Sequence, residues 1–392
     1  MHTELVEKRR WISEERFLHA LNFCMLLPGP EAQQLATYIG WLMHGTRGGI
    51  VAGALFVIPS IFILLALSWV YVIYGHVAWI AAIFFGLKPA VMAIVAHAVI
   101  RIGKKALKNA VMYALAAAAF VAIYFFHIPF PAIIVSAAAI GLIGGTYFPR
   151  LFSVIKDLDP ESPREGTRPT MLRTVSVVVV CLALWWTPVL LLGVWRGWDS
   201  VFVSEGIFFS KAAMVTFGGA YAVLPYVAQN AVEHHHWLTA PQMMDGLGLA
   251  ETTPGPLIMV VQFVGYLGGW NDAGGLPQWF AALLGALITT WVTFLPCFLW
   301  IFLGAPYIER LRSNVKLSTV LTAITATVVG VVLNLAVWFG LQTIFPAATE
   351  VNWFGIAVGI IAFIGLLRWK WDVVPVVLAC GTIGILYRLI ST

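Results

Sequence analysis

Long runs of apolar residues, separated by short polar turns, dominate the hydropathy pattern of this chain. Three further apolar segments, 17–44, 205–225 and 243–268, are interrupted by glycine and proline. A helix needs about 20 apolar residues to cross the hydrocarbon core of a membrane. The pattern therefore predicts an all-α polytopic membrane protein with about 9–12 membrane segments, some of them interrupted or re-entrant. The uninterrupted runs are roughly 48–74, 77–100, 109–126, 130–147, 174–195, 279–304, 317–345, 352–367 and 373–388.

The composition agrees with a membrane protein and excludes several soluble classes. Of the 392 residues, 60% are hydrophobic and 10% are charged, whereas a soluble domain carries about 25% charged residues. A cytosolic enzyme, a nucleic-acid-binding module and a secreted disulfide scaffold are thereby excluded. The four cysteines lie singly within apolar runs, without the spacing of a metal site, and we expect them to be packing residues: Cys24, Cys181, Cys297 and Cys380.

Two parts of the sequence are related to each other. Residues 6–30 align without a gap to residues 232–256, and both end in the tripeptide Pro-Gly-Pro. Further along, Pro59 matches Pro296 at a spacing that is larger by eleven residues, which places an insertion in the sequence GGWNDAGGLPQ. The duplication predicts two homologous repeats joined by a charged, proline-containing linker: a first repeat at 1–148, a linker at 149–173 and a second repeat at 174–392.

The lysines and arginines indicate the orientation, because basic residues collect in cytoplasmic loops. They cluster at 8–10, 101–108 and 149–173 in the first half, and at 310–316 and 368–370 in the second. All five clusters reach the cytoplasm if the second repeat has inverted topology and the three interrupted segments enter and leave on one side. An arrangement in which the interrupted segments cross completely would place the first cluster outside, and it ranks second.

The two Pro-Gly-Pro breaks are the candidate transport site. Proline removes a backbone N–H donor and interrupts the helix, so such breaks occur in membranes where protein or a water-filled cavity covers them. The half-helices that start at Glu31 and Leu257 would present free N–H groups and a positive dipole end, which suits an anion. Two alternatives stay open: kinked helices that merely pack together, and a helix-capping role for Glu31.

Polar side chains and glycines near the breaks complete the candidate site. Amides and hydroxyls can replace the hydration shell of an oxyanion, and a carboxylate can bind a proton. A lysine would supply a counter-charge, although Lys211 could instead extend to the membrane surface. The candidate substrate-binding residues are Pro28, Gly29, Pro30, Glu31, Gln33, Gln34, Phe217, Gly218, Gly219, Glu251, Thr252, Thr253, Pro254, Gly255, Pro256, Lys88 and Lys211.

The sequence contains no nucleotide-binding, hydrolase or metalloprotease motif. We therefore expect no enzymatic activity, no cofactor and no metal site. Transport would be driven by an ion gradient, the membrane potential or the substrate gradient. The spacings Gly141-x-x-x-Gly145 and Gly355-x-x-x-Gly359 predict close helix packing within or between subunits, which makes a homodimer a candidate assembly.

The stretches LLPGPEAQQLATYIGW, FGGAYAVLPYV and GLAETTPGPLIMVVQFVGY closely resemble the chromate ion transporter family, in particular its long, two-domain bacterial members. The resemblance covers essentially the whole chain. It implies a bacterial inner-membrane protein that exports chromate from the cytoplasm and confers resistance, with sulfate as a competing mimic. It also implies site residues at the two Pro-Gly-Pro motifs and at 217–219. Such members begin with a first-half FGG segment, whose equivalent here would fall before Met1.

Two other functions remain as alternatives to chromate export. One is transport of sulfate or a related tetrahedral oxyanion, because these anions share charge and geometry. The other is a membrane-embedded enzyme, such as a reductase, which would need a redox cofactor site that the sequence does not show. The lipid bilayer is the expected environment, and no nucleic-acid partner is expected.

Overall fold

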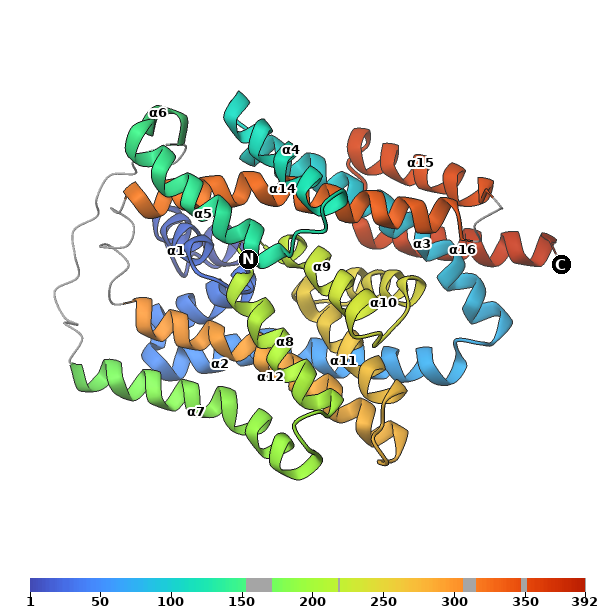
Figure 1. Cartoon of the computed structure of the whole chain (residues 1–392), viewed down its shortest axis with the longest axis horizontal. Coiled ribbons are helices and arrows are strands. Elements are labelled where there is room, and N and C mark those ends of the chain that lie inside the picture. Colours follow the sequence, from blue (N-terminus) through green and yellow to red (C-terminus); the bar gives the residue numbers. More distant parts are fainter. Residues whose placement is uncertain (153–170, 218, 306–314, 347–350, 392) are drawn as a thin grey trace.

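The computed structural model describes residues 1–152, 171–217, 219–305, 315–346 and 351–391, and all regular secondary structure in them is helical. The predicted all-α class is confirmed. In chain order (Figure 1), the helices are η1 (Thr3–Lys8), α1 (Glu14–Leu26), α2 (Glu31–Tyr74), α3 (Ala78–Ala106), α4 (Ala110–Tyr124), α5 (Phe130–Tyr147), α6 (Pro149–Phe152), α7 (Met171–Arg196), α8 (Val201–Val215), α9 (Ala220–Gln229), η2 (Asn230–His234), α10 (Ala240–Thr252), η3 (Leu257–Met259), α11 (Val260–Asn271), α12 (Gln278–Gly304), α14 (Val315–Ile344), α15 (Trp353–Arg368) and α16 (Val373–Ser391).

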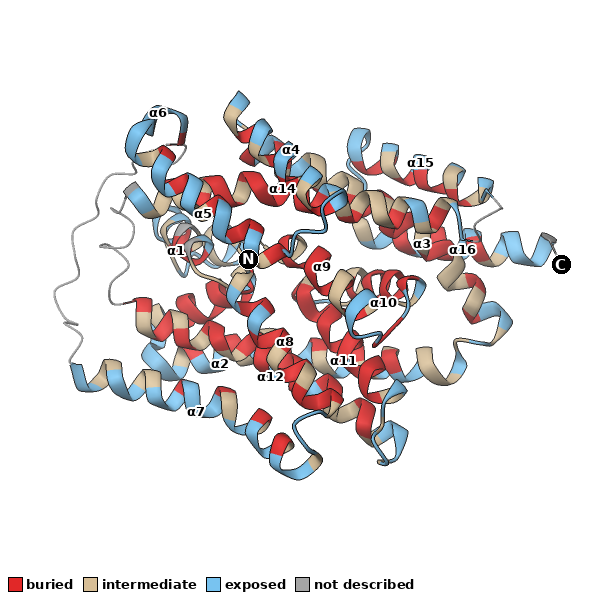
Figure 2. Ribbon diagram, viewed as in Figure 1, coloured by how far each residue is buried: buried red, intermediate tan, exposed pale blue. Residues whose placement is uncertain are grey.

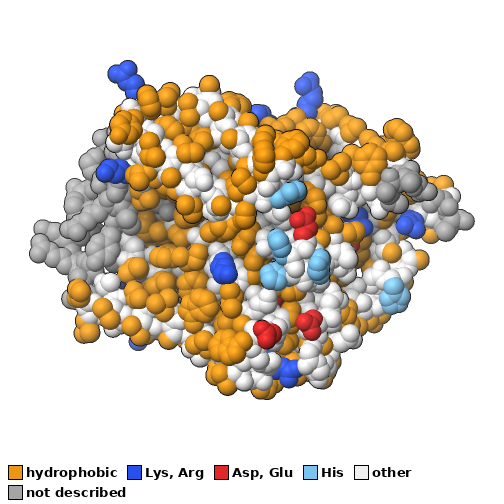
Figure 3. All heavy atoms as spheres, in the orientation of Figure 1, with side chains coloured by type: hydrophobic (Ala, Val, Ile, Leu, Met, Phe, Trp, Pro, Cys, Tyr) orange, Lys and Arg blue, Asp and Glu red, His pale blue; other side chains and the backbone are white. Residues whose placement is uncertain are grey.

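Seven of the described helices are long and apolar enough to cross a membrane: α2, α3, α5, α7, α12, α14 and α16. Helices α4 and α15 are also apolar but have only 15 and 16 residues. Large apolar side chains such as Phe62 and Val135 are exposed on the surface, as expected for a surface that faces lipid (Figure 3). The polytopic membrane class is therefore confirmed. Residues 153–170 of the predicted linker lie outside the described part of the chain.

The three interrupted segments of the sequence form three helical hairpins. These are α1 with the first part of α2, α8 with α9, and α10 with α11. Their arms are short: α1 has 13 residues and α8 has 15, whereas a membrane span needs about 20. Each hairpin turns at the glycine-containing motif that interrupts its sequence, at 27–30, 216–219 and 253–256.

Helix α2 consists of two helical parts and folds back on itself between them. His44 and Gly45 have non-helical backbone angles, and Gly45 has a φ of +64°. The two parts then pack closely, because a Cβ on Gly40 would lie 2.4 Å from the Gly48 carbonyl oxygen. Helices α11 and α12 make the equivalent crossing between Gly265 and Gly285. Their connection runs through residues 272–277, within the sequence where the alignment predicts the insertion.

Long helices of each half pack against helices of the other half. Helix α14 lies along α4 and α5, and α3 lies along α15 and α16. Small residues permit these contacts: a Cβ on Gly330 would lie 1.9 Å from the Ala116 carbonyl oxygen, and one on Gly86 would lie 2.2 Å from that of Cys380. Gly141 likewise packs on the α14 backbone at Val320. The close packing predicted for this glycine thus occurs within the chain.

The bundle has two distinguishable ends (Figure 1). At one end the side-chain amide of Asn109, between α3 and α4, donates to the Leu151 carbonyl in α6. At the other end Arg196, at the close of α7, donates to the Gly274 carbonyl in the α11–α12 connection. The described residues of clusters 101–108 and 149–173 meet at the first end, which we call the basic end. Buried residues concentrate between the two ends, around α9 to α12 (Figure 2).

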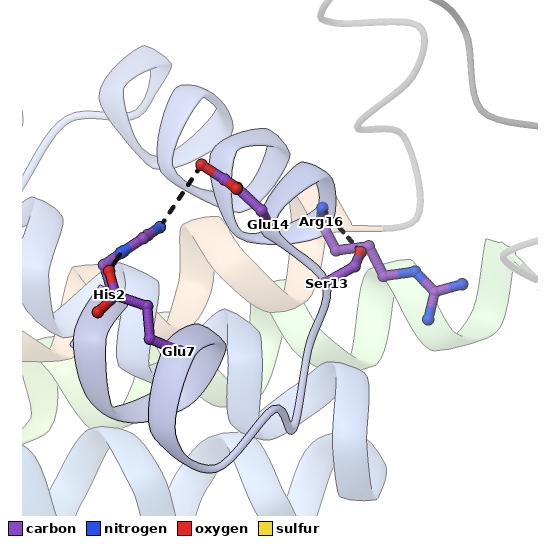
Figure 4. Close-up of polar contacts among 5 residues, drawn as sticks. All are labelled: His2, Glu7, Ser13, Glu14 and Arg16. Carbon is purple, nitrogen blue, oxygen red and sulfur yellow. Dashed lines mark hydrogen bonds and ion pairs between the residues drawn. The ribbon is translucent and has the colours of Figure 1, made fainter.

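The N-terminal segment covers part of the basic end. The His2 ring lies 3.1 Å from Glu7 and 3.9 Å from Glu14, and the Ser13 hydroxyl caps α1 by accepting from the Arg16 backbone N–H (Figure 4). Apolar residues of α1, including Phe23, pack against the last turn of α12. These contacts fix α1 as the outer arm of its hairpin.

Candidate functional site

The turns of the first two hairpins along the chain meet in the interior. The Gly29 N–H, in the first Pro-Gly-Pro, donates to the Thr216 carbonyl at 2.8 Å. Thr216 ends α8 and directly precedes the Phe-Gly-Gly sequence. Three glycines in the interrupted segments have left-handed φ values, +120° at Gly29, +96° at Gly219 and +131° at Gly255, a conformation that glycine adopts without steric cost. Gly218 lies outside the described residues.

Each Pro-Gly-Pro turn contacts the long helix of the other half at corresponding positions. The Ser60 hydroxyl, one residue after Pro59 in α2, donates to the Pro254 carbonyl at 2.6 Å. Cys297 is one residue after Pro296 in α12, and its Sγ lies 3.0 Å from where a Cβ on Gly29 would be. Each turn is thus contacted by the residue that follows the mid-helix proline of the other half, so the arrangement is reciprocal.

Helix starts follow both turns, as the sequence predicts. Helix α2 begins at Glu31, and η3 begins at Leu257 and continues into α11. Behind the first turn, Gln33 and Gln34 are fully buried. The Gln34 amide donates to the Pro28 carbonyl at 2.7 Å, whereas neither polar atom of the Gln33 amide has a hydrogen-bond partner in the described structure. Gln33 therefore has two free polar atoms beside the turn.

The threonines of the second turn are directed into their own helix. The Thr252 and Thr253 hydroxyls both donate to the Leu249 carbonyl of α10, at 2.9 and 2.8 Å. Their protons therefore satisfy the end of α10 in this conformation. Only their lone pairs remain available, and these do not attract an anion.

The two glutamates of the motifs face cations of α3. The Tyr221 hydroxyl donates to Glu251, and the Arg101 guanidinium lies 5.8 Å from the centre of the Tyr221 ring. Arg101 is also within electrostatic range of Glu251, as Lys105 is of Glu31. In the sequence these two cations indicate only a cytoplasmic cluster, and nothing there singles out Tyr221. The signal available was the position of Arg101, which directly follows the apolar run 77–100.

Lys88 lies near a buried acidic residue that is not part of either Pro-Gly-Pro motif. It is within electrostatic range of Asp245 in α10, and Asp245 accepts a hydrogen bond of 2.9 Å from the Tyr71 hydroxyl. Asp245 is almost fully buried. Asp245 is not among the residues predicted from the sequence, because a single aspartate in a short amphipathic segment gives no local signal.

Lys211 lies at the end opposite the basic end. It lines a depression of about 460 Å³ together with Asp199, Asn230 and His235. The His235 ring stacks on Trp237 at 4.3 Å, and partial burial, together with the positive charges of neighbouring His234, His236 and Lys211, lowers the pKa of His235. Phe217 packs at the edge of the main apolar core. The contacts described for Lys88 and Lys211 are thus with Asp245 and with this depression.

Glu205 is a buried acid that sequence reasoning also missed. Its side chain is fully buried, and neither carboxyl oxygen has a hydrogen-bond partner in the described structure. The oxygens lie against Gly268 and Gly285, where α8 meets the α11–α12 crossing. A carboxylate without partners is very costly to bury, so we expect this group to be neutral here.

Known proteins resemble this chain over most of its length. A chromate transport protein of Cupriavidus metallidurans is 28% identical over 356 residues, which cover 89% of this chain and 79% of that protein. A probable chromate transport protein of Synechococcus elongatus is 28% identical, covering 94% of this chain and 84% of its own. A chromate transport protein of Pseudomonas aeruginosa is 31% identical, and the match covers 98% of this chain and 86% of that protein. No solved structure matches.

A family model described as "Chromate transporter" matches residues 1–142 and 205–385, one segment in each half of the chain. This is a family of membrane transport proteins and not of enzymes. That this chain is a member supports chromate transport. Together with the seven apolar helices, it indicates a multi-pass protein of the bacterial plasma membrane. The chain belongs to the chromate transporter family.

Proposed function

We propose that this protein is a secondary transporter that exports chromate from the cytoplasm and thereby confers chromate resistance. The observation that carries the proposal is the contact between the first Pro-Gly-Pro turn and the Thr216 carbonyl, deep in the bundle. It brings the start of one half-helix to the turn of another hairpin. Helix N-termini attract anions, and buried Gln33 supplies unpartnered amide atoms next to them.

The nearby cations answer an electrostatic objection to this site. A dianion beside Glu31 and Glu251 would be repelled if both carboxylates were uncompensated. Arg101 and Lys105 lie within electrostatic range of these two carboxylates. We propose that these cations, more than Lys88 or Lys211, offset the carboxylates when the oxyanion binds. Protonation of either glutamate would have the same effect.

Energetics favour export over uptake for a carrier without a nucleotide-binding motif. Moving one charge through 100 mV is worth about 2.3 kcal/mol, so a dianion leaving an interior-negative cell gains about 4.6 kcal/mol. This is enough to sustain a gradient of roughly a thousandfold. Export therefore needs no co-transported ion, whereas uptake would need one. Sulfate has the same charge and shape, and we propose that it competes as a mimic.

Uptake of radiolabelled chromate into everted membrane vesicles tests the proposal, because uptake there corresponds to export from the cell. We expect uptake that depends on expression of the chain, stops when valinomycin and potassium collapse the potential, and is inhibited by sulfate. Vesicles without the protein are the control. Expression-dependent sulfate uptake that chromate does not inhibit would assign another oxyanion. Chromium recovered as Cr(III) in place of Cr(VI) would instead indicate a reductase.

A further inference from the structure

A depression at the basic end combines an apolar wall with a cluster of positively charged side chains. It has a volume of about 430 Å³ and lies between the last three turns of α3 and the turn that joins α15 to α16. Of the nine described residues that line it, four carry a fixed positive charge and none is acidic. We call it the basic vestibule; its polar lining consists of His97, Arg101, Lys104, Lys105, Lys370 and the indole of Trp371.

The positions of these cations follow from the local structure. Residues 97, 101, 104 and 105 recur at the spacing of one helix face, so their side chains emerge on the same side of α3. Lysines also stabilise a helix C-terminus through the dipole, but this does not account for Lys370, which comes from another element. Lys370 has a left-handed φ of +53° in the tight α15–α16 turn. The vestibule is therefore built by two elements.

The cations of the vestibule are not paired within the described structure. The ion pairs His2–Glu7, His2–Glu14 and Lys8–Glu4 involve none of these four cations. Arg101, Lys104, Lys105 and Lys370 are exposed to solvent. Four like charges around one depression repel one another, and a bound dianion would relieve that repulsion. A water molecule takes up about 30 Å³, so the space accommodates an oxyanion with much of its hydration shell.

The vestibule adjoins the candidate transport site through two of its own residues. Arg101 lines it and also lies over the ring of Tyr221, which is hydrogen-bonded to Glu251 in the last turn of α10. Lys105 lines it and lies within electrostatic range of Glu31. An anion in the vestibule would therefore reach the carboxylates of both Pro-Gly-Pro motifs by moving past cations already present.

We propose that the basic vestibule is a second anion site, at which a free tetrahedral dianion is captured from the cytoplasm before Arg101 passes it to the Pro-Gly-Pro turns. The proposal rests on the proposed export function. The phosphate of an anionic lipid headgroup shares this chemistry, and the test below separates the two sources.

Sulfate binding, measured by calorimetry, tests whether the vestibule captures a dianion. The protein is purified and placed in nanodiscs of phosphatidylcholine alone. We expect Lys104→Gln/Lys370→Gln to weaken binding about tenfold at low salt, since each exposed lysine contributes a modest share of the attraction. The matched control is Lys8→Gln/Arg150→Gln, which removes the same charge outside the vestibule and should bind like the wild type. Added salt should weaken wild-type binding more steeply than binding to the vestibule variant. Equal binding by wild type and vestibule variant overturns the proposal.

Two further arms distinguish the sources and the functions. If phosphatidylcholine nanodiscs show no sulfate binding, and phosphatidylglycerol is retained by wild type but lost from the variant, the site belongs to lipid and the proposal fails. In everted vesicles the vestibule variant should raise the KM for chromate about tenfold at unchanged maximal rate. Transport with unchanged KM overturns the vestibule alone. A wild type that binds sulfate through the vestibule but transports no chromate overturns the proposed export alone.

Discussion

Ser60 and Cys297 occupy corresponding positions and contact opposite Pro-Gly-Pro turns. A hydroxyl and a thiol differ little in size, although the thiol is the weaker donor. We expect Ser60→Cys to keep chromate transport within about threefold of wild type, because a net hydrogen bond is worth about 1 kcal/mol. Ser60→Leu should abolish transport, because a Cβ on Gly255 would already lie 1.8 Å from the Ser60 hydroxyl. Vesicle transport, normalised to protein level by immunoblot, measures both; equal loss in the two variants contradicts the expectation.

Half-buried Lys88 lies within electrostatic range of buried Asp245, and the two residues lend themselves to a double-mutant cycle. Removing Lys88 takes away a positive charge near the buried Asp245 carboxyl, and burying a carboxylate with less compensation is costly. Lys88→Gln should therefore lower the melting temperature of the detergent-solubilised protein markedly. Lys88→Gln/Asp245→Asn should restore most of that loss, while Tyr71→Phe should cost less than either single charge change. Additive losses in the double variant would show that the two side chains do not interact.

Residue chemistry at the site was only partly predictable from the sequence. The turns and half-helix starts follow from proline and glycine, whose effects are local. Arg101 was harder to select, because a lysine- and arginine-rich helix end is already explained by a cytoplasmic location. Asp245 and Glu205 gain their importance from burial by distant helices, which no neighbouring residue reveals.

At the level of elements, the two halves build one crossing with different connections. The first half turns at His44 and Gly45, whereas the second uses residues 272–277. We expect insertion of the sequence DAGGLP between His44 and Gly45 to preserve transport, because the second half tolerates this length at the corresponding place. Gly40→Leu should abolish transport, since its side chain would meet the Gly48 backbone. The measurement is chromate uptake into vesicles that contain the membrane-inserted variant. An insertion variant that does not transport chromate would contradict the proposed correspondence between the two connections.

Helix partners were the part of the fold that the sequence did not reveal. Alignment of the repeats located the hairpins and the insertion, because these depend on short motifs. The packing of α14 on α4 and α5 depends on single glycines such as Gly330, which resemble any other small residue in an apolar run. The sequence pattern specifies which face of a helix carries small residues, but not which other helix packs against that face.

For the whole molecule, the charge distribution predicts which end faces the cytoplasm. The four native cysteines are buried, so a membrane-impermeant maleimide should give little background. We expect Lys108→Cys, at the basic end, to be labelled in everted vesicles and protected in right-side-out ones. Asp199→Cys, in the opposite depression, should show the reverse. Labelling of both positions from one side would contradict the predicted orientation.

The packing of helices from one half against those of the other has a consequence for biosynthesis. Helices α4 and α5 find their partner α14 only after well over a hundred further residues have been made. At translation rates of about 5–20 residues per second, they wait roughly ten to thirty seconds in the bilayer. Throughout that delay the faces destined for α14 are open to lipid or to other nascent helices. The ribosome thus fixes the order of assembly, and a stalled chain would remain an unfinished bundle.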